Sequence, residues 1–474
     1  MRSAGFRRSR TRRTSAAALV TALALTALAS CGTSSSNSEE DDSGSGSGSS
    51  DPSAPLDPKA EVTLSIDCMP PAAKAAELRE WNEDIKAFGK IYPNVRINGK
   101  STPGQCLEPP RFTAMLKGKS QPDVFYAYFT DLQQVLDNDG AEDISAYVTE
   151  TSVPALKDIQ PQVIDVARKD GKLYALPTSN YTMGLMINRK LFTQAGLDPN
   201  TPPSTWEGVR AASKKIAALG KGVAGFGEYS AGNNGGWHFA ATQYGLGGDV
   251  VDASGKKAAF NDEKGKQVLQ QLHDMRWEDN SMGQTQLLKW GDLQKRISTD
   301  KLGMFLAAPD DIAYMVQQLG AEYENFGLGP IPGGQGTLFG GNNYMIKKGS
   351  SPDRIKAAVA WLNFKNLSPG KGQFDWARTK KDQLPVGLPQ PNFFTGRSKA
   401  ADDAARAANA TMPVENFKAF TDNPVQGKAE PPKAQEIYKI LDVAMSGVLT
   451  NEDADIDKLL DTAEQQVNQV LANQ

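Results

Sequence analysis

Short apolar runs and longer amphipathic segments alternate along the chain from residue 61 onward. Runs rich in branched apolar and aromatic residues predict β-strands at 62–66, 95–97, 123–127, 302–306 and 344–346. Apolar residues at helical spacing predict helices at 72–92, 112–118, 239–244, 263–277 and 287–297, and two more near the C-terminus. This alternation predicts an α/β fold with mostly parallel sheets, whose ligands bind beyond the carboxyl ends of the strands.

Two helix starts carry capping signals. In Ser204-Thr205-Trp206-Glu207, the serine hydroxyl and the glutamate carboxylate can satisfy each other's backbone N–H groups. Ser351 precedes Pro352, and proline is favoured at the first helical position. Helices are therefore expected to begin at both places.

The stretch 170–209 predicts a passage from one globular lobe to another, because 474 residues exceed a single ordinary core. Two apolar runs, 172–176 and 183–187, flank the polar–aromatic patch 178–182. Pro177 supplies no N–H to a ladder, so the first strand is expected to stop there. The patch is expected to face a cleft, with Asn180 and Tyr181 as candidate ligand contacts.

The first residues are typical of an export signal. Residues 1–14 hold six arginines and no acid, and the apolar segment 16–29 is too short for a stable bilayer anchor. The sequence Leu28-Ala29-Ser30-Cys31-Gly32 resembles the lipobox of bacterial lipoproteins, which implies that residues 1–30 are removed and that Cys31 is lipidated. An ordinary secretory signal is the alternative, and the arginine pairs leave twin-arginine export open. Residues 31–60 are mostly Ser, Gly, Asp and Glu, and are expected to form a disordered tether.

Removing Cys31 leaves an even pair, Cys68 and Cys106, in an oxidising compartment. Each follows a predicted strand, and the ends of neighbouring parallel strands can lie within bridging distance. A disulfide between Cys68 and Cys106 is predicted, with two buried free thiols as the alternative.

Composition limits the possible chemistry. The 52 basic and 55 acidic residues form no basic region, which argues against nucleic acid as a partner. The only two histidines, His238 and His273, are interpreted as structural, and neither a Walker loop nor a zinc-spaced Cys/His set occurs in the body of the chain. No catalytic set, metal site or cofactor is therefore predicted. A secreted glycoside hydrolase is the weaker alternative, since the adjacent Asp310 and Asp311 are expected to point apart.

Aromatic residues near predicted loops, beside amides and carboxylates, suit carbohydrate binding. Sugar rings present an apolar face that stacks on flat side chains and hydroxyls that exchange hydrogen bonds. Asn180 with Tyr181, Trp237 and Asp310 has this chemistry. The alternative for each aromatic ring is core packing.

The order of several motifs resembles family 1 extracellular solute-binding proteins of ABC importers, the maltose-binding type. The motifs are Pro122-Asp-Val124, Asp170-Gly-Lys-Leu-Tyr-Ala-Leu-Pro177, Met186-Ile-Asn188, Pro203-Ser-Thr-Trp206-Glu207, Leu302-Gly-Met304 and Gly340-Gly-Asn-Asn343. The resemblance implies the two-lobed type II periplasmic-binding-protein fold, with hinge closure on a ligand. It implies a first lobe at 61–178 and 343–400, a second at 182–340 and 404–474, and crossings at 178–182, 340–343 and 400–404.

By position in the family, ligand contacts are expected at Tyr128, Phe129, Asn180, Tyr181, Trp237, Asp310, Gly341 and Asn342. The resemblance implies a monomeric carbohydrate binder, held at the extracellular face of the membrane by its lipid, that delivers its ligand to a permease. Cys68-Met-Pro-Pro71 lacks the charged residue of the maltodextrin binder, and Asp310 stands where a Trp often does. A peptide, a polyamine or an organic phosphate is therefore the alternative ligand. The shortage of clustered arginines argues against phosphate.

Overall fold

The computed structural model describes residues 51–101, 106–220 and 222–472. The predicted signal peptide, the lipidation position Cys31 and the tether up to residue 50 lie outside these ranges. Within them, none of the helices combines the length and the apolar composition of a membrane span.

The first sheet has six strands. Five follow the order β12-β11-β3-β1-β2, and the sixth, β6, pairs with β11. Its strands are β1 (Val62–Ile66), β2 (Val95–Gly99), β3 (Val124–Tyr128), β6 (Ala175–Thr182), β11 (Thr337–Ile346) and β12 (Gly427–Ala429). Strand β1 is parallel to β2 and β3, whereas β11 is antiparallel to β3 and β6. The predicted strands at 62–66, 95–97, 123–127 and 344–346 are all confirmed.

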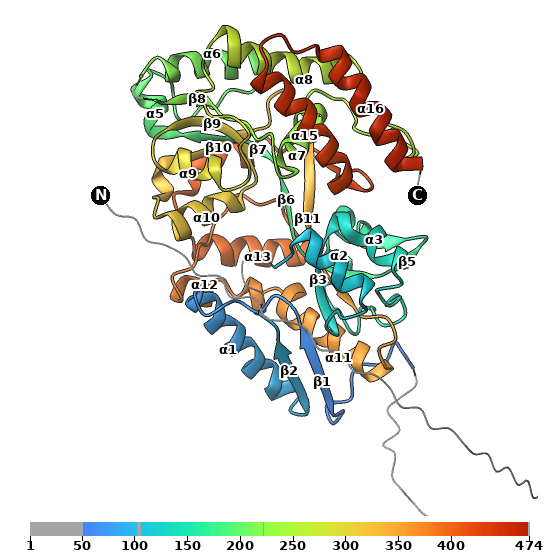
Figure 1. Cartoon of the computed structure of the whole chain (residues 1–474). Helices are drawn as coiled ribbons and strands as arrows, with labels where there is room; N and C mark the ends of the chain where they lie inside the picture. The colour runs from blue at the N-terminus through green and yellow to red at the C-terminus, as the bar shows by residue number, and fades with distance from the viewer. Residues whose placement is uncertain (1–50, 102–105, 221, 473–474) are drawn as a thin grey trace, which may run out of the picture. The chain divides into compact units, whose positions relative to one another are not determined.

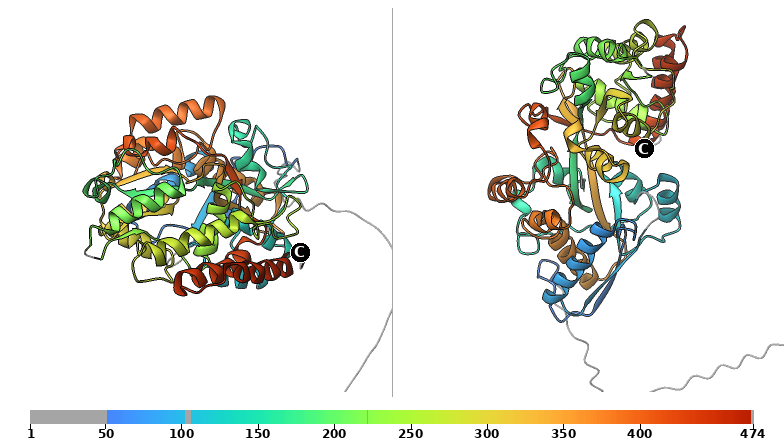
Figure 2. Two further views of the ribbon diagram at one scale, coloured as in Figure 1. Left: turned by 90° about the horizontal axis from the view of Figure 1, so that it is seen from above. Right: turned by 90° about the vertical axis from the view of Figure 1, so that its left-hand side faces the viewer.

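Helices flank this sheet and form the first lobe with it (Figures 1 and 2). They are α1 (Ala75–Ile91), α2 (Pro109–Lys117), η1 (Phe129–Asp131), α3 (Leu132–Asp137), η2 (Leu156–Asp158), α4 (Pro161–Asp165), α11 (Pro352–Leu362), η5 (Asn363–Leu367), η6 (Gly372–Phe374), α12 (Trp376–Lys381) and α13 (Gly396–Ala408). A small hairpin, β4 (Arg168–Lys169) and β5 (Lys172–Leu173), completes it. Trp81, Phe88 and Trp361 pack edge to face in its core, so the periodicity that predicted α1 and α11 identified their buried faces.

The second lobe contains a four-stranded sheet in the order β10-β7-β9-β8. The strands are β7 (Gly184–Asn188), β8 (Ala224–Phe226), β9 (Leu302–Ala307) and β10 (Phe326–Pro330). The helices are α5 (Arg189–Gln194), α6 (Trp206–Ala217), α7 (Asn234–Gly245), α8 (Glu263–His273), η3 (Asp274–Glu278), α9 (Asp292–Ser298), α10 (Asp310–Leu319), η4 (Tyr323–Asn325), η7 (Val414–Phe417), α14 (Lys418–Thr421), α15 (Ala434–Thr450) and α16 (Ile456–Ala472). In this sheet β8, β9 and β10 run in one direction and β7 runs against them, since β7 is antiparallel to both β9 and β10 while β8 is parallel to β9.

Strands β6 and β11 pass between the two lobes as an antiparallel pair (Figure 1). The predicted crossings 178–182 and 340–343 lie opposite each other in this ladder, where Thr182 pairs with Phe339 and Ser179 with Asn342. The prediction that the first strand stops at Pro177 is wrong, because β6 continues through it. The register shifts between Asn342 and Asn343, beside Pro177, and such a bulge accommodates a residue without an N–H.

The third predicted crossing, 400–404, differs from the structure. These residues lie inside helix α13, which contacts α12 of the first lobe. The next segments, η7 and α14, contact β10 of the second lobe. The chain therefore changes lobe only after Ala408.

The two predicted helix caps have different outcomes. Helix α6 is capped by Thr205, whose side-chain oxygen accepts a hydrogen bond from the Gly208 N–H at 3.1 Å, so the predicted capping box at Ser204 is wrong by one residue. Ser351 caps α11 as predicted, accepting from the Arg354 N–H at 3.4 Å.

Cys68 and Cys106 form a disulfide, with Cα atoms 5.2 Å apart. Cys68 comes shortly after β1, and the bond closes 38 residues of sequence. It ties the loop after β1 to the segment before α2.

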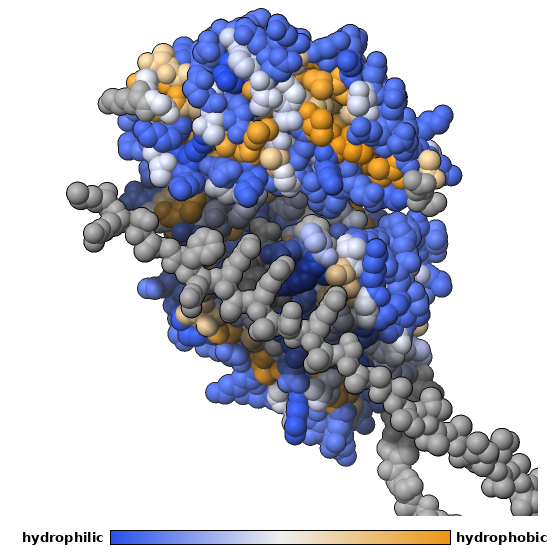
Figure 3. All heavy atoms as spheres, viewed as in Figure 1, coloured by the Kyte–Doolittle hydropathy of each residue, from blue (hydrophilic) through white to orange (hydrophobic). Residues whose placement is uncertain are grey.

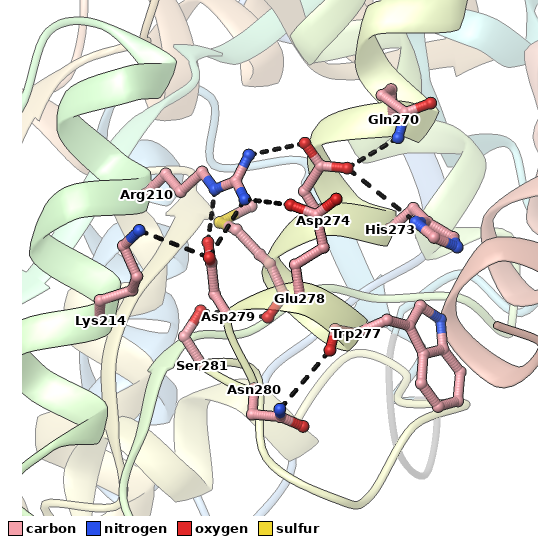
Figure 4. Close-up of polar contacts among 11 residues, drawn as sticks. Arg210, Lys214, Gln270, His273, Asp274, Trp277, Glu278, Asp279, Asn280 and Ser281 are labelled. Atoms are coloured by element: carbon pink, nitrogen blue, oxygen red, sulfur yellow. Dashed lines mark hydrogen bonds and ion pairs between the residues drawn. The ribbon is translucent and has the colours of Figure 1, made fainter.

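An ion-pair network joins α6 to η3 in the second lobe (Figure 4). The Arg210 guanidinium contacts the carboxylates of Asp274, Glu278 and Asp279, and Lys214 lies 3.4 Å from Asp279. Although burial alone would raise the pKa of Asp279, the hydrogen bonds from Arg210 lower it overall.

The face of the molecule shown in Figure 3 is mostly hydrophilic, with apolar side chains in small groups.

Candidate functional site

Side chains on the crossing strands β6 and β11 alternate between two faces. Tyr181 lies opposite Gly340, whereas Asn180 and Thr182 lie opposite Gly341 and Phe339. Because successive residues of a strand point to opposite sides, Tyr181 lies on one face and Asn180 on the other. We call the face that carries Tyr181 the front face and the other the rear face.

The front face carries a group of tyrosines from three strands. Tyr128 at the end of β3 pairs with Asn342 on β11, and Tyr126 pairs with Tyr344. The Tyr126 ring lies 5.9 Å from the Tyr128 ring and 5.8 Å from that of Tyr344, both edge to face. Strand alternation therefore builds a continuous aromatic wall on the first lobe.

Trp237 extends this wall from the second lobe. Its ring lies 6.2 Å from that of Tyr181, in an edge-to-face arrangement. It belongs to the first turn of α7, which Asp442 of α15 holds in place by accepting the N–H groups of Asn233 and Gly236 at 2.6 and 2.9 Å. Behind it, the buried His238 contacts the Glu228 carboxylate, which is consistent with the structural role predicted for this histidine.

Two carboxylates with raised pKa values accompany the aromatic wall. Burial raises the pKa of Asp131 to about 7, even though its carboxylate accepts the Tyr128 N–H at 2.8 Å. Burial also raises the pKa of Glu430, to about 8, and the Tyr438 hydroxyl donates to it at 3.0 Å. Burial, together with Glu430 and Asp310, raises the pKa of Tyr181 well above its ordinary value, so these three groups face the same region.

Asp310 and Asp311 begin α10 and point to different surroundings. Asp311 is buried, and its Oδ1 accepts from Gln294 at 2.8 Å and from the Trp290 indole at 3.2 Å. Asp310 keeps contact with solvent, although the protein around it raises the pKa of its carboxyl. Burial is the main cause that raises the pKa values of Tyr126, Tyr128 and Tyr181, and the charge of Asp310 is a further cause. The Asp310 carboxylate therefore lies beside the front face.

The structure brings together five of the eight predicted ligand contacts. We define the front site by the side chains that share this region: Tyr126, Tyr128, Asp131, Tyr181, Trp237, Asp310, Asn342 and Glu430. Of the predicted residues, Tyr128, Tyr181, Trp237, Asp310 and Asn342 belong to it.

The other three predicted contacts lie elsewhere. Phe129 packs in the core of the first lobe, with its ring 5.8 Å from that of Phe339. Gly341 has no side chain, and an added Cβ would lie 2.5 Å from the Phe129 ring, so the glycine is required by packing. Asn180 is only 5% exposed and lines a cavity on the rear face. The prediction that Asn180 and Tyr181 contact one ligand together conflicts with strand alternation.

Tyr126, Asp131 and Glu430 belong to the front site but are not among the eight predicted ligand contacts. Tyr126 could have been found, because it lies in the predicted strand 123–127, two positions before Tyr128, and alternate residues of a strand share a face. Glu430 follows the short strand β12 and reaches the site because β12 pairs with β11. No local pattern in the sequence predicts that pairing.

The front site combines flat aromatic faces with hydrogen-bond acceptors, and burial favours the neutral form of its carboxyl groups. Neither lysine nor arginine is among the groups that shift the pKa values of Asp131, Asp310 and Glu430 in the described part of the chain. Among the described residues, no group of three His, Cys, Asp or Glu side chains is arranged to hold a metal ion. The arrangement can stack against apolar rings and accept hydrogen bonds from hydroxyl or ammonium groups.

Comparisons with known proteins agree with this architecture. A family model described as bacterial extracellular solute-binding protein matches residues 72–365. The sn-glycerol-3-phosphate-binding periplasmic protein UgpB of Brucella melitensis is 27% identical over 330 residues, which cover 65% of this chain and 70% of that protein.

Solved structures share the fold. The cyclic alpha-maltosyl-1,6-maltose binding protein of Arthrobacter globiformis superposes with a TM-score of 0.68 at 22% identity, covering 88% of this chain and 100% of that one. UgpB of Mycobacterium tuberculosis, solved with glycerophosphocholine, gives 0.65 at 16% identity, covering 87% and 98%. At these identities the likeness supports the fold alone.

Proposed function

The chain belongs to the bacterial extracellular solute-binding proteins, and we propose that its front site binds a carbohydrate, either a monosaccharide or an oligosaccharide. As a member of this family it is the solute-binding component of an ABC importer and not an enzyme. The two crossing strands β6 and β11 would serve as hinges, so that the lobes close on the ligand before delivery to the permease.

The observation that carries this proposal is the front site itself. Tyr181 and Trp237 are partly exposed rings in edge-to-face contact, and such rings offer apolar surface to a sugar ring. Asn342 and the carboxylates of Asp310 and Glu430 offer acceptors for the hydroxyls around that ring.

An organic phosphate, suggested by the UgpB relatives, suits this site poorly. Phosphate recognition usually relies on arginine or lysine, whereas the charged groups identified in the front site are carboxylates. Two like unit charges about 5 Å apart repel by about 3 kcal/mol at an effective dielectric constant near 20. A phosphate dianion would meet this repulsion only from carboxyls that stay ionised, and burial limits their number by raising the pKa of Asp131 to about 7 and that of Glu430 to about 8.

The lipid anchor completes the proposal at the cell surface. Lipidation at Cys31 would hold the binding lobes at the extracellular face of the membrane through residues 31–60, in a monomer that passes its ligand to the permease. Mass spectrometry of the protein isolated from membranes would reveal a diacylglyceryl-modified N-terminal cysteine. A free serine or alanine N-terminus nearby would instead indicate an ordinary secretory signal.

Thermal-shift screening of the purified protein tests the ligand class. A neutral sugar at about 100 times its dissociation constant should add about 2.7 kcal/mol of stability, which is readily seen in a melting curve. The same screen should include sn-glycerol-3-phosphate and glycerophosphocholine. A shift with either phosphate ester, and with no carbohydrate, would overturn the proposal.

A second candidate ligand is a solute with a cationic group, such as a polyamine. Carboxylates without a basic partner beside aromatic rings also stabilise ammonium groups, through charge and through cation–π contacts. Spermidine in the same screen separates the two candidates, because its shift should vanish at high salt whereas that of a neutral sugar should persist.

A further inference from the structure

The rear face of the crossing strands borders a cavity of about 460 Å³. Its wall includes Asn180 and Thr182 from β6 and Phe339 from β11, on the side opposite to Tyr181. The strand pair β6–β11 therefore separates this cavity from the front site. Its volume falls within the range of about 300–1,000 Å³ that small-molecule sites occupy.

Elements of both lobes enclose the rear cavity. Gln160 and Gln162, around the start of α4, belong to the first lobe, whereas Phe420 on α14 packs with the second. On this side, the Gln162 side-chain amide donates to the Gly427 carbonyl at 2.8 Å. An occupant would therefore contact both lobes beside the strands that connect them.

Asn180 is the feature of the cavity that indicates a ligand. Its side chain is 5% exposed and lines the cavity, and no described residue hydrogen-bonds to it. Its amide atoms stay accessible from the cavity, so water or another polar molecule there completes their hydrogen bonds. Because an amide both donates and accepts, it suits a hydroxyl, which does the same.

The remaining lining indicates the charge and shape of the occupant. Asp403 pairs with Arg406 at 3.2 Å and also with Lys399, so α13 offsets part of the Arg406 charge beside the cavity. The other polar lining groups are amides and hydroxyls, and Pro389 and Pro391 add flat apolar surface. This combination suits a neutral molecule with both hydroxyls and an apolar face.

We propose that the rear cavity is a second binding site, separate from the front site, for a neutral polyol of monosaccharide size. Asn180 and Thr182 would hydrogen-bond to its hydroxyls. This proposal does not depend on what the front site binds.

Calorimetric titration with sorbitol, myo-inositol and glucose tests the rear site in a Trp237→Ala background, which disables the front site. Saturable binding of at least one of these probes is expected. Binding should weaken about tenfold when Asn180→Leu or Thr182→Val is added, as expected for one lost hydrogen bond. Thr182→Val conserves shape and serves if Asn180→Leu fails to fold. Absence of saturable binding to all three probes, or binding unchanged by the folded rear-face variants, would overturn the proposal.

Discussion

The Glu430 carboxyl should make the stability of the unliganded protein depend on pH, and Glu430→Gln should remove that dependence. Its pKa rises from 4.5 to about 8 on folding, mainly through burial. A raised folded-state pKa means that the folded state holds its proton more tightly than the unfolded state does. The stabilising contribution is therefore complete below about pH 4 and is lost as the pH rises through about 8.

The magnitude follows from linkage. One pKa unit corresponds to about 1.4 kcal/mol, and the shift of Glu430 would give about 5 kcal/mol as an upper bound. Because Glu430 is only half-buried, solvent screening reduces the effect to about 1–2 kcal/mol. Relative to the wild type, Glu430→Gln should gain that amount of unfolding free energy between about pH 5 and pH 8.5.

Urea denaturation at several pH values measures this difference, provided that the slope of free energy against urea is unchanged. Glu207→Gln, at an exposed position on α6, is the matched control and should follow the wild type. If the curves of Glu430→Gln and the wild type stay parallel from pH 5 to pH 8.5, burial does not perturb Glu430 and the electrostatic description of the front site fails.

Three further substitutions test other parts of the structure. Trp237→Ala should abolish the sugar-induced thermal shift, and retained binding would exclude Trp237 from the site. Because the ring also packs against both cores of the second lobe, the substitution should lower the melting temperature by a few degrees. Gly236→Ala should cost about 1–3 kcal/mol in urea denaturation, because the added Cβ would lie 2.2 Å from the Tyr438 carbonyl oxygen; an unchanged stability would mean that α7 and α15 can separate freely. Arg210→Met should also cost about 1–3 kcal/mol, because it removes the guanidinium that the part-buried carboxylates of Asp274 and Asp279 share. Lys157→Met, which breaks an exposed pair, should cost less than about 0.5 kcal/mol, and equal losses would refute the importance of the network.

Much of the fold could be predicted from local pattern. The helices expected after Pro203 and Ser351 form, and their tryptophans Trp206 and Trp361 are 5% and 1% exposed. The crossing at 178–182 is predicted by a polar patch between two apolar runs, and in the structure it lies opposite 340–343 in the β6–β11 ladder. Each of these features depends on periodicity within one segment, which the sequence states directly.

The site was harder to predict, because it depends on pairing between distant segments. Whether Asn180 or Tyr181 faces the ligand depends on the register of β6 against β11, which shifts beside Pro177. A one-residue change of register exchanges the two faces of a strand. Glu430 is placed by the pairing of β12 with β11, and Trp237 by the cap that Asp442 provides from α15.

The interleaved connection of the lobes bears on how the chain is made. The first core joins residues 56–176 to 339–394, and the main core of the second lobe draws on residues 183–338 and 434–471. Neither core can be completed by a growing chain until distant segments have been synthesised, and the second needs α16 at the very end. Contacts between such distant segments slow folding. A nascent chain of this protein is therefore expected to remain unfolded through most of its synthesis, the condition in which a polypeptide can be threaded across a membrane.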